Sequence, residues 1–184
     1  MASSEYFVVK CDKYMNFDMK FLRRKSVRRK TNHWDKIGRK DNKINVVILG
    51  IDSTSRAHAY RSLPQTMRLI KKNGFVDFKG FHSVGPSTVY NMIALLTGKT
   101  PEQLVPTCQA RPESPYDNCS FIWKEFSDDY YLTQFIEDGA QSFNWGNHGG
   151  FSKKPVDFYA HPLFLAIDKL RSSNKLVIFL VTYL

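Results

Sequence analysis

The side chains with the clearest capacity for chemistry are Asp52 and Thr88, which adjoin two different kinds of segment. Asp52 directly follows the apolar run 46–51, whose length and lack of polar alternation predict a strand buried on both faces. Thr88 opens a segment with apolar residues at helical spacing, and Gly98 is a typical residue to end such a helix. Ligands bind beyond the carboxyl ends of parallel strands. The pattern therefore predicts Asp52 and Thr88 at one sheet edge, where a helix N-terminus favours anions.

Both side chains also have ordinary structural roles as alternatives. A carboxylate at the end of a strand binds a metal ion, acts as a general base, or caps the turn that follows it, here residues 53–56. A threonine at the start of a helix is commonly an N-cap, and its hydroxyl needs a base or a metal ion to become a nucleophile. The residues alone leave these alternatives open.

The rest of the chain alternates predicted strands and helices, which is the order of an α/β domain. The predicted strands are 5–10, 46–52, 75–81, 130–136 and 176–184. The predicted helices are 62–72, 87–98, 121–126 and 157–171. The Pro-rich segment 99–119 is predicted as a loop. This order predicts a parallel or mixed sheet with helices on both faces, and the last predicted strand suggests a sheet that is incomplete at the C-terminus.

Positive charge is concentrated in one segment. Residues 20–43 contain eleven Lys or Arg and two acids, so they carry nine of the net charge of +10. The chain is therefore divided into a short N-terminal strand within 1–11, a basic linker or exposed arm over 12–43, and the α/β portion 44–184. The basic segment is either a solvated loop or a contact for a polyanion such as nucleic acid or heparin, and no zinc-finger spacing accompanies it.

The composition, 42% hydrophobic and 14% aromatic, is enough for a packed core. No apolar stretch reaches the ~18 residues of a membrane helix, and the first ten residues lack the pattern of a secretory signal. Three cysteines leave at least one unpaired within the chain. Cys108 and Cys119 flank a Pro-rich loop, and they are predicted either to form a disulfide or to remain as two reduced, half-buried thiols.

The spacing of Thr88, Asn91 and Thr97 resembles the alkaline phosphatase superfamily, in particular its phosphodiesterase-like branch. The nucleophilic Thr of that branch stands in a T-x-x-N box nine residues before the Thr of a T-G pair, which is the spacing here. The strand 46–52 resembles the first strand of the superfamily, whose terminal Asp binds metal. Sulfatases proper differ, because they carry a Cys or Ser nucleophile with a following Arg and usually two adjacent Asp residues.

Over a longer span the chain resembles an animal family called domain of unknown function 229, a sulfatase-like group with the alkaline phosphatase fold. The matching segments are Leu49–Arg56, Leu63–Thr66, Leu95–Gly98, Cys119–Lys124 and Asp157–Phe164. The resemblance implies that Asp52 and Thr88 bind a divalent metal, zinc or calcium, that Thr88 is the metal-activated nucleophile, and that Asn91 helps bind the oxygens of the transferred group. It also implies a phosphate or sulfate ester as substrate, small-molecule or glycan, and an extracellular or secretory-pathway location.

The resemblance accounts for only half of a two-metal site. The superfamily takes its remaining Asp and His ligands from later segments, including an Asp-His pair. The histidines of this chain match none of those motifs: His33, His58, His82, His148 and His161. We therefore expect a fragment without appreciable hydrolase activity of its own. Two other classes stay open, a non-enzymatic binding protein that keeps the fold and a polyanion binder that uses residues 20–43.

Overall fold

A computed structural model describes residues 5–11, 14–38, 43–108, 116–137 and 150–171 as a mixed α/β structure. The helices of these ranges are α1 (Lys25–Ile37), α2 (Arg56–Ser62), α3 (Pro64–Lys72), α4 (Thr88–Thr97), α5 (Pro101–Cys108), α6 (Ile122–Asp128) and α7 (His161–Arg171). The strands are β1 (Tyr6–Cys11), β2 (Tyr14–Met19), β3 (Gln134–Phe135) and β4 (Phe158–Tyr159). None of these helices is long and apolar enough to cross a membrane.

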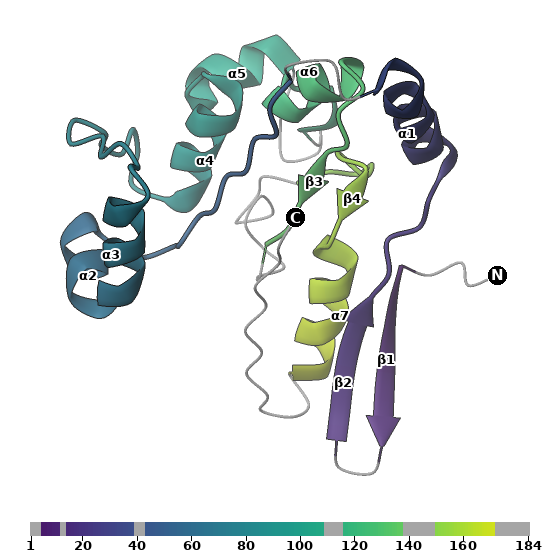
Figure 1. The fold of residues 1–184 in the computed structure, drawn as a ribbon, viewed down its shortest axis with the longest axis horizontal. Coiled ribbons are helices and arrows are strands. Elements are labelled where there is room, and N and C mark those ends of the chain that lie inside the picture. The colour runs from purple at the N-terminus through teal and green to yellow at the C-terminus, as the bar shows by residue number, and fades with distance from the viewer. Residues whose placement is uncertain (1–4, 12–13, 39–42, 109–115, 138–149, 172–184) are drawn as a thin grey trace.

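Most of the elements fall into three groups in space (Figure 1). The β1–β2 hairpin lies beside α7, and α4, α5 and α6 gather at the opposite end of the molecule. Helices α2 and α3 lie apart from both groups and are reached through a long extended segment. Within the hairpin, β1 and β2 pair antiparallel, with Tyr6 opposite Met19. Tyr6, Phe17 and Met19 pack against the apolar residues at the start of α7, so the hairpin gains the apolar support that two strands alone lack.

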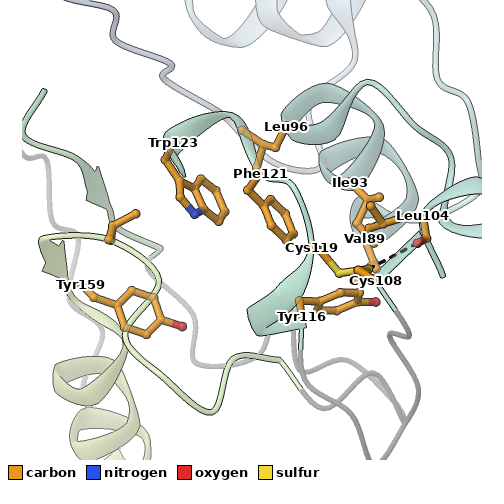
Figure 2. Packing of buried hydrophobic residues seen from close by; sticks show 11 residues of the cluster. Val89, Ile93, Leu96, Leu104, Cys108, Tyr116, Cys119, Phe121, Trp123 and Tyr159 are labelled. Atoms are coloured by element: carbon orange, nitrogen blue, oxygen red, sulfur yellow. Dashed lines mark hydrogen bonds between the residues drawn. A yellow bond between two sulfur atoms is a disulfide. The ribbon is translucent and has the colours of Figure 1, made fainter. Parts of the chain in front are cut away.

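The larger cluster of buried apolar residues lies around α4, α5 and the segment that leads into α6 (Figure 2). Its completely buried side chains come from all three of these elements: Ile93, Leu104, Cys119 and Phe121. The ring of Phe121 stacks on that of Trp123, with 4.4 Å between the centroids. A disulfide joins Cys108 to Cys119, which decides between the two alternatives that the sequence left open.

The helical predictions are largely confirmed in this region. α4 begins at Thr88 and ends at Thr97, and its C-cap is Gly98, whose φ of 68° is a left-handed conformation that glycine adopts without strain. α6 matches the short helix predicted over 121–126. The prediction of a loop over 99–119 is wrong for residues 101–108, which form α5. Pro101 is the first residue of this helix, where proline is tolerated, and Leu104 and Cys108 share its buried face.

The extended central sheet predicted from the sequence is not seen in the described ranges. Segments 46–52 and 75–81 have no strand partner among the described residues, and their apolar side chains are exposed, from 53% for Val46 to 81% for Leu49. A strand needs a neighbour to satisfy its backbone groups, so an apolar run alone does not make a sheet. The sheets that are present there have two strands each.

Other predicted elements are confirmed in part. β1 confirms the predicted strand 5–10. The predicted strand 130–136 is reduced to β3, which pairs in parallel with β4. The predicted helix 157–171 begins only at His161, and the predicted helix 62–72 corresponds to α3, which is preceded by α2. The predicted strand 176–184 lies outside the described residues.

The segment 12–43, predicted as a linker or exposed arm, contains both a strand and a helix. β2 pairs with β1, and α1 places Val27, Lys30 and Trp34 on one face. Val27 and Lys30 are buried, with Lys30 only 2% exposed. Residues 14–19 and 25–37 of this segment are thus regular structure, and a count of charges does not reveal which lysine is buried. The division of the chain into domains stays a prediction.

Candidate functional site

The structure brings Asp52 and Thr88 into contact. The Thr88 hydroxyl donates a hydrogen bond to Asp52 Oδ1 over 3.1 Å, although the two residues are 36 positions apart. Thr88 is the first residue of α4, and Asp52 lies in the turn that follows the extended segment 46–51. The predicted closeness of these two side chains is therefore confirmed, whereas the sheet edge expected beneath them is not seen in the described part of the chain.

The turn that carries Asp52 has an unusual backbone. Ser53 has a φ of 54°, in the left-handed region that residues other than glycine seldom occupy. The Thr54 hydroxyl donates to the Asp52 carbonyl oxygen over 3.1 Å, and Ser55 caps α2 by accepting from the His58 N–H. Strain of this kind persists where the surroundings impose it, and it is frequent at ligand sites. The turn therefore holds the Asp52 carboxylate in a defined place at the entrance to α2.

Asn91 shapes the loop on the other side of the contact. Its Nδ2 donates to the carbonyl oxygens of Gly85 and Ser87 over 2.9 and 2.7 Å, and its Oδ1 accepts from the Val84 N–H over 2.8 Å. Both amide hydrogens are thus engaged with the loop that enters α4. The geometry makes Asn91 a positioning residue for Thr88, and its predicted contact with a transferred group would require one of these bonds to break.

The same loop depends on Gly85. A Cβ at this position would lie 2.6 Å from Cβ of Tyr90, closer than real Cβ contacts. The loop therefore folds back on the first turn of α4 only because residue 85 has no side chain. Together with the Asn91 bonds, this close approach fixes where the loop delivers Thr88.

Asp52 and Thr88 fit a divalent cation as part of its ligand set. A carboxylate and a hydroxyl supply two oxygen donors of the kind that calcium prefers, and zinc also accepts carboxylate oxygen. The two oxygens already lie within hydrogen-bond distance, so one ion could bridge them. In the described ranges no group of three His, Cys, Asp or Glu side chains converges. The site therefore offers part of one coordination shell.

A surface ion pair lies close to this contact in the chain. Arg56, the first residue of α2, donates through Nε to Asp77 Oδ1 over 3.2 Å and through Nη2 to Oδ2. The hydrogen bond to Arg56 holds the pKa of Asp77 below its usual value, and the same bond raises the pKa of Arg56. The pair joins the helix after the Asp52 turn to the segment 75–81, and nothing in the sequence indicated it.

The histidines have roles outside this contact. His58 Nε2 lies 3.2 Å from the Ser62 hydroxyl, and His82 Nδ1 lies 3.1 Å from the Gly80 carbonyl. His33 stacks on the ring of Tyr130, with 3.8 Å between the centroids. His161 stacks on Tyr159, and burial lowers the pKa of its imidazole. His148 lies outside the described residues.

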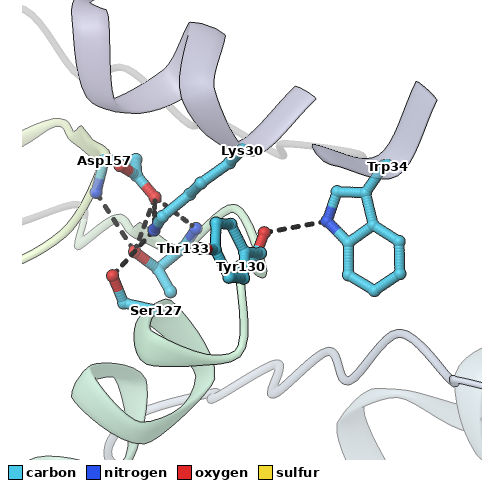
Figure 3. Close-up of polar contacts among 6 residues, drawn as sticks. All are labelled: Lys30, Trp34, Ser127, Tyr130, Thr133 and Asp157. Atoms are coloured by element: carbon cyan, nitrogen blue, oxygen red, sulfur yellow. Dashed lines mark hydrogen bonds and ion pairs between the residues drawn. The ribbon is translucent and has the colours of Figure 1, made fainter. Parts of the chain in front are cut away.

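The second polar cluster of the described chain is buried and centres on Lys30 (Figure 3). Lys30 Nζ lies 2.6 Å from Asp157 Oδ2 and 2.7 Å from the Ser127 hydroxyl. Asp157 also accepts from the backbone N–H and the hydroxyl of Thr133, over 3.0 and 3.2 Å. The side chains of Lys30 and Asp157 are 2% and 6% exposed. A charge this deeply buried requires such partners, so the cluster anchors α1 to the segments around β3 and β4.

Sequence reasoning missed this cluster, although one signal was present. Lys30 stands three residues after Val27 and four before Trp34, on the face that a helix would bury. The Trp34 Nε1 donates to the Tyr130 carbonyl oxygen over 2.8 Å, so the same face makes a second polar contact. A helical interpretation of residues 25–37 would have singled out Lys30 as a buried cation in need of a carboxylate.

Comparisons with known proteins now place the chain. No curated protein and no solved structure matches it. The profile of one family, described as "Protein of unknown function (DUF229)", matches residues 2–177, which is nearly the whole chain. The match covers the Asp52–Thr88 contact, the Lys30 cluster and the disulfide-linked core. The chain therefore belongs to the DUF229 family.

Proposed function

We propose that this domain belongs to a hydrolase of phosphate or sulfate esters in which Thr88 is the nucleophile and Asp52 a metal ligand. The observation that carries the proposal is the 3.1 Å hydrogen bond between their side chains across 36 positions of sequence. The resemblance of the T-x-x-N spacing to the alkaline phosphatase superfamily supports the same roles. The substrate on this proposal is a small-molecule or glycan ester, and the location is extracellular or in the secretory pathway.

The residues around the contact have distinct parts in the proposed reaction. Thr88 Oγ1 gives its proton to solvent and attacks the phosphorus or sulfur atom, while the bond to the alcohol oxygen of the ester breaks and the alcohol takes up a proton. A water molecule then hydrolyses the resulting threonine ester. The first N–H groups of α4, beside Thr88, are suited to the oxygens of the transferred group. Asn91 holds the loop that leads into α4 by its hydrogen bond to Gly85, and Asp52 orients the Thr88 hydroxyl by accepting its hydrogen bond. A bound zinc or calcium ion would lower the pKa of that hydroxyl and neutralise charge on the ester.

Metal binding is the direct test, because it does not depend on a complete active site. Manganese is a paramagnetic substitute, and we expect it to broaden the amide resonances of Ser53 and Thr88 in a labelled sample of the whole chain. The broadening should be lost in Asp52→Asn and kept in Asp77→Asn, which removes another exposed carboxylate. Equal broadening in all three proteins, or none in the wild type, would overturn the assignment of Asp52 as a ligand.

Catalysis by this chain alone is expected to be negligible. Asp52 and Thr88 supply two oxygens, whereas two-metal chemistry needs ligands for both ions and a separation of about 4 Å. Assays with chromogenic phosphate monoesters, phosphate diesters and sulfate esters should give no turnover above the Thr88→Ala variant with zinc, manganese or calcium. Metal-dependent turnover that Thr88→Ala abolishes would support the nucleophile and overturn the argument from ligand number.

A second candidate function is contact with a polyanion through residues 20–43. The observation that favours it is that α1 is a folded helix with four exposed cations along it: Lys25, Arg28, Arg29 and Lys36. Such a surface attracts any polyanion in a salt-dependent manner. A salt titration of binding to a polyanion column tests this candidate, and elution at low salt by the wild type would contradict it.

A further inference from the structure

The exposed side of α1 carries four cations, three of them in its N-terminal half. Lys25, Arg28, Arg29 and Lys36, here called the basic face, are exposed, while Val27 and Lys30 point into the protein. At the rise of an α-helix the basic face extends over about 16 Å along the axis. Asp35 is the acidic residue of the helix, and it lies in the last turns, away from the first three cations. The N-terminal half of the basic face is therefore uniformly positive.

The cations of the basic face are not neutralised by the rest of the described chain. No ion pair is found for any of the four in those ranges. Their neighbours differ, because Arg24 pairs with Glu5 and Lys43 pairs with Asp129, each over 3.3 Å. Within the described ranges these two pairs compensate one cation before and one cation after the basic face, and no carboxylate there pairs with the face itself.

The arrangement is also unfavourable for the helix by itself. Lys25, Arg28 and Arg29 have the i, i+3 and i+4 spacing at which like charges repel. They stand in the N-terminal half of α1, where the helix dipole favours anions. The first turn contains no acidic residue, and Arg24 at the N-cap makes no side-chain capping bond. An anion bound along this face would relieve both kinds of repulsion.

Two contacts fix the direction of the basic face. The buried ion pair of Lys30 with Asp157 holds the opposite side of α1 against the protein. The Arg29 guanidinium lies 5.8 Å from the centroid of the Tyr130 ring, which restrains a long side chain that would otherwise lose entropy on binding. The cations are therefore presented on a rigid helix and not on a flexible arm.

We propose that the basic face of α1 binds a sulfated polysaccharide. The proposal rests on the polyanion contact named above and gives it a partner class. The disulfide between Cys108 and Cys119 is typical of oxidising compartments, where sulfated glycans are the abundant polyanions. Tyr130, the aromatic ring that adjoins the face, is already stacked by His33, so it offers no free platform for a nucleic-acid base.

The experiment measures binding of the whole chain to fluorescent heparin by anisotropy at several salt concentrations. The variant Lys25→Glu/Arg28→Glu/Arg29→Glu reverses the N-terminal part of the basic face. The matched control Arg68→Glu/Lys71→Glu/Lys72→Glu makes the same change of net charge on α3, where all three cations are exposed. We expect the first variant to bind at least about tenfold more weakly, with a salt slope smaller by about 2 to 3, and the control to lose less than about threefold.

The remaining outcomes separate the partner class from the contact itself. Heparin should raise the melting temperature of the wild type and of the α3 control, because it relieves the repulsion within α1, and it should not do so in the α1 variant. Equal weakening in the two variants would overturn the location. Tighter binding to single-stranded RNA than to heparin at one salt concentration would overturn the glycan and keep the polyanion contact. Absence of binding to both would overturn the contact.

Discussion

The segments 88–128 and 44–81 are both rich in apolar side chains, but they are packed in opposite ways. Phe121 in the first is completely buried and Phe78 in the second is 76% exposed. The first segment folds into α4, α5 and α6 around a disulfide, whereas the second supplies α2, α3 and two extended stretches that pair with no strand in the part of the chain that the structure describes. The candidate site lies where they meet, because Asp52 comes from 44–81, here called the open segment, and Thr88 comes from 88–128, here called the packed segment.

The difference follows from how each kind of element satisfies its backbone. A helix pairs its own N–H and C=O groups, so a helical period produces structure as soon as one apolar face finds cover. A strand requires a second chain segment at about 4.8 Å before its backbone is paired. The Cys108–Cys119 disulfide also links the last residue of α5 to the segment just before α6, which restricts the conformations of the unfolded chain. Stability should therefore be concentrated in 88–128.

The largest expected effect is the loss of a buried aromatic ring. Phe121→Ala should lower the free energy of unfolding by about 3–5 kcal/mol, because it removes the ring that stacks on Trp123 and leaves a cavity beneath α4. The measurement is urea unfolding followed by tryptophan fluorescence and far-UV circular dichroism. A loss of less than about 1 kcal/mol would contradict the inference that stability is concentrated in 88–128, because it would be close to the effect of an ordinary surface substitution.

The next effect concerns the buried cation of α1. Lys30→Met should cost about 3 kcal/mol, because the Asp157 carboxylate then stays buried without a counterion. Lys36→Met on the same helix is the matched control and should change stability by less than about 0.5 kcal/mol, since Lys36 is exposed.

The double variant Lys30→Met/Asp157→Asn distinguishes the charge from the packing. It should be more stable than Lys30→Met alone, because an amide at position 157 carries no uncompensated charge and can still accept from the Thr133 N–H and hydroxyl. A double variant no more stable than the single variant would show that the Lys30 stem, and not its charge, stabilises α1.

The third effect is a dependence of folding stability on pH, which arises from His161 at the start of α7. Burial lowers the pKa of His161 from its model-peptide value of 6.5, so the folded protein favours the neutral imidazole. Below pH 6.5 the unfolded chain binds more protons than the folded one, and stability falls as the pH decreases through this window. His161→Gln should show a smaller decrease in urea stability between pH 7.5 and 5.5 than wild type, with His58→Gln as the control for an exposed imidazole. Equal decreases in wild type and His161→Gln would contradict the assignment.

The sequence was informative where local patterns decide the structure. The apolar spacing from Val89 to Leu96 and the glycine at 98 predicted α4 within one residue, and the Asp52–Thr88 contact followed from the ends of two segments. It failed where the structure depends on partners. Residues 46–52 have the composition of a buried strand, yet in the described chain nothing pairs with them.

Charge patterns were misleading for a related reason. Lys30 and Lys36 are equivalent in a count of charges, but the helical period places one against Asp157 and the other in solvent. Asn91 likewise carries the same side chain whether it binds a ligand or a loop, and only its three hydrogen bonds to residues 84–87 reveal the second role. The roles of Asp52, Thr88 and Asn91 in catalysis stay predictions until metal binding and turnover are measured.

The smallest expected effect tests the open segment itself. Phe78→Ala repeats the Phe121→Ala change at a site that is 76% exposed. Ile48→Ala removes an exposed apolar side chain from the extended segment before Asp52. Each should change the free energy of unfolding by less than about 0.5 kcal/mol, because little apolar area is removed from contact with the protein. A loss above about 2 kcal/mol at both positions would mean that they are covered as core residues are. The central sheet predicted from the sequence would then form in solution, and Asp52 would stand at the end of a paired strand.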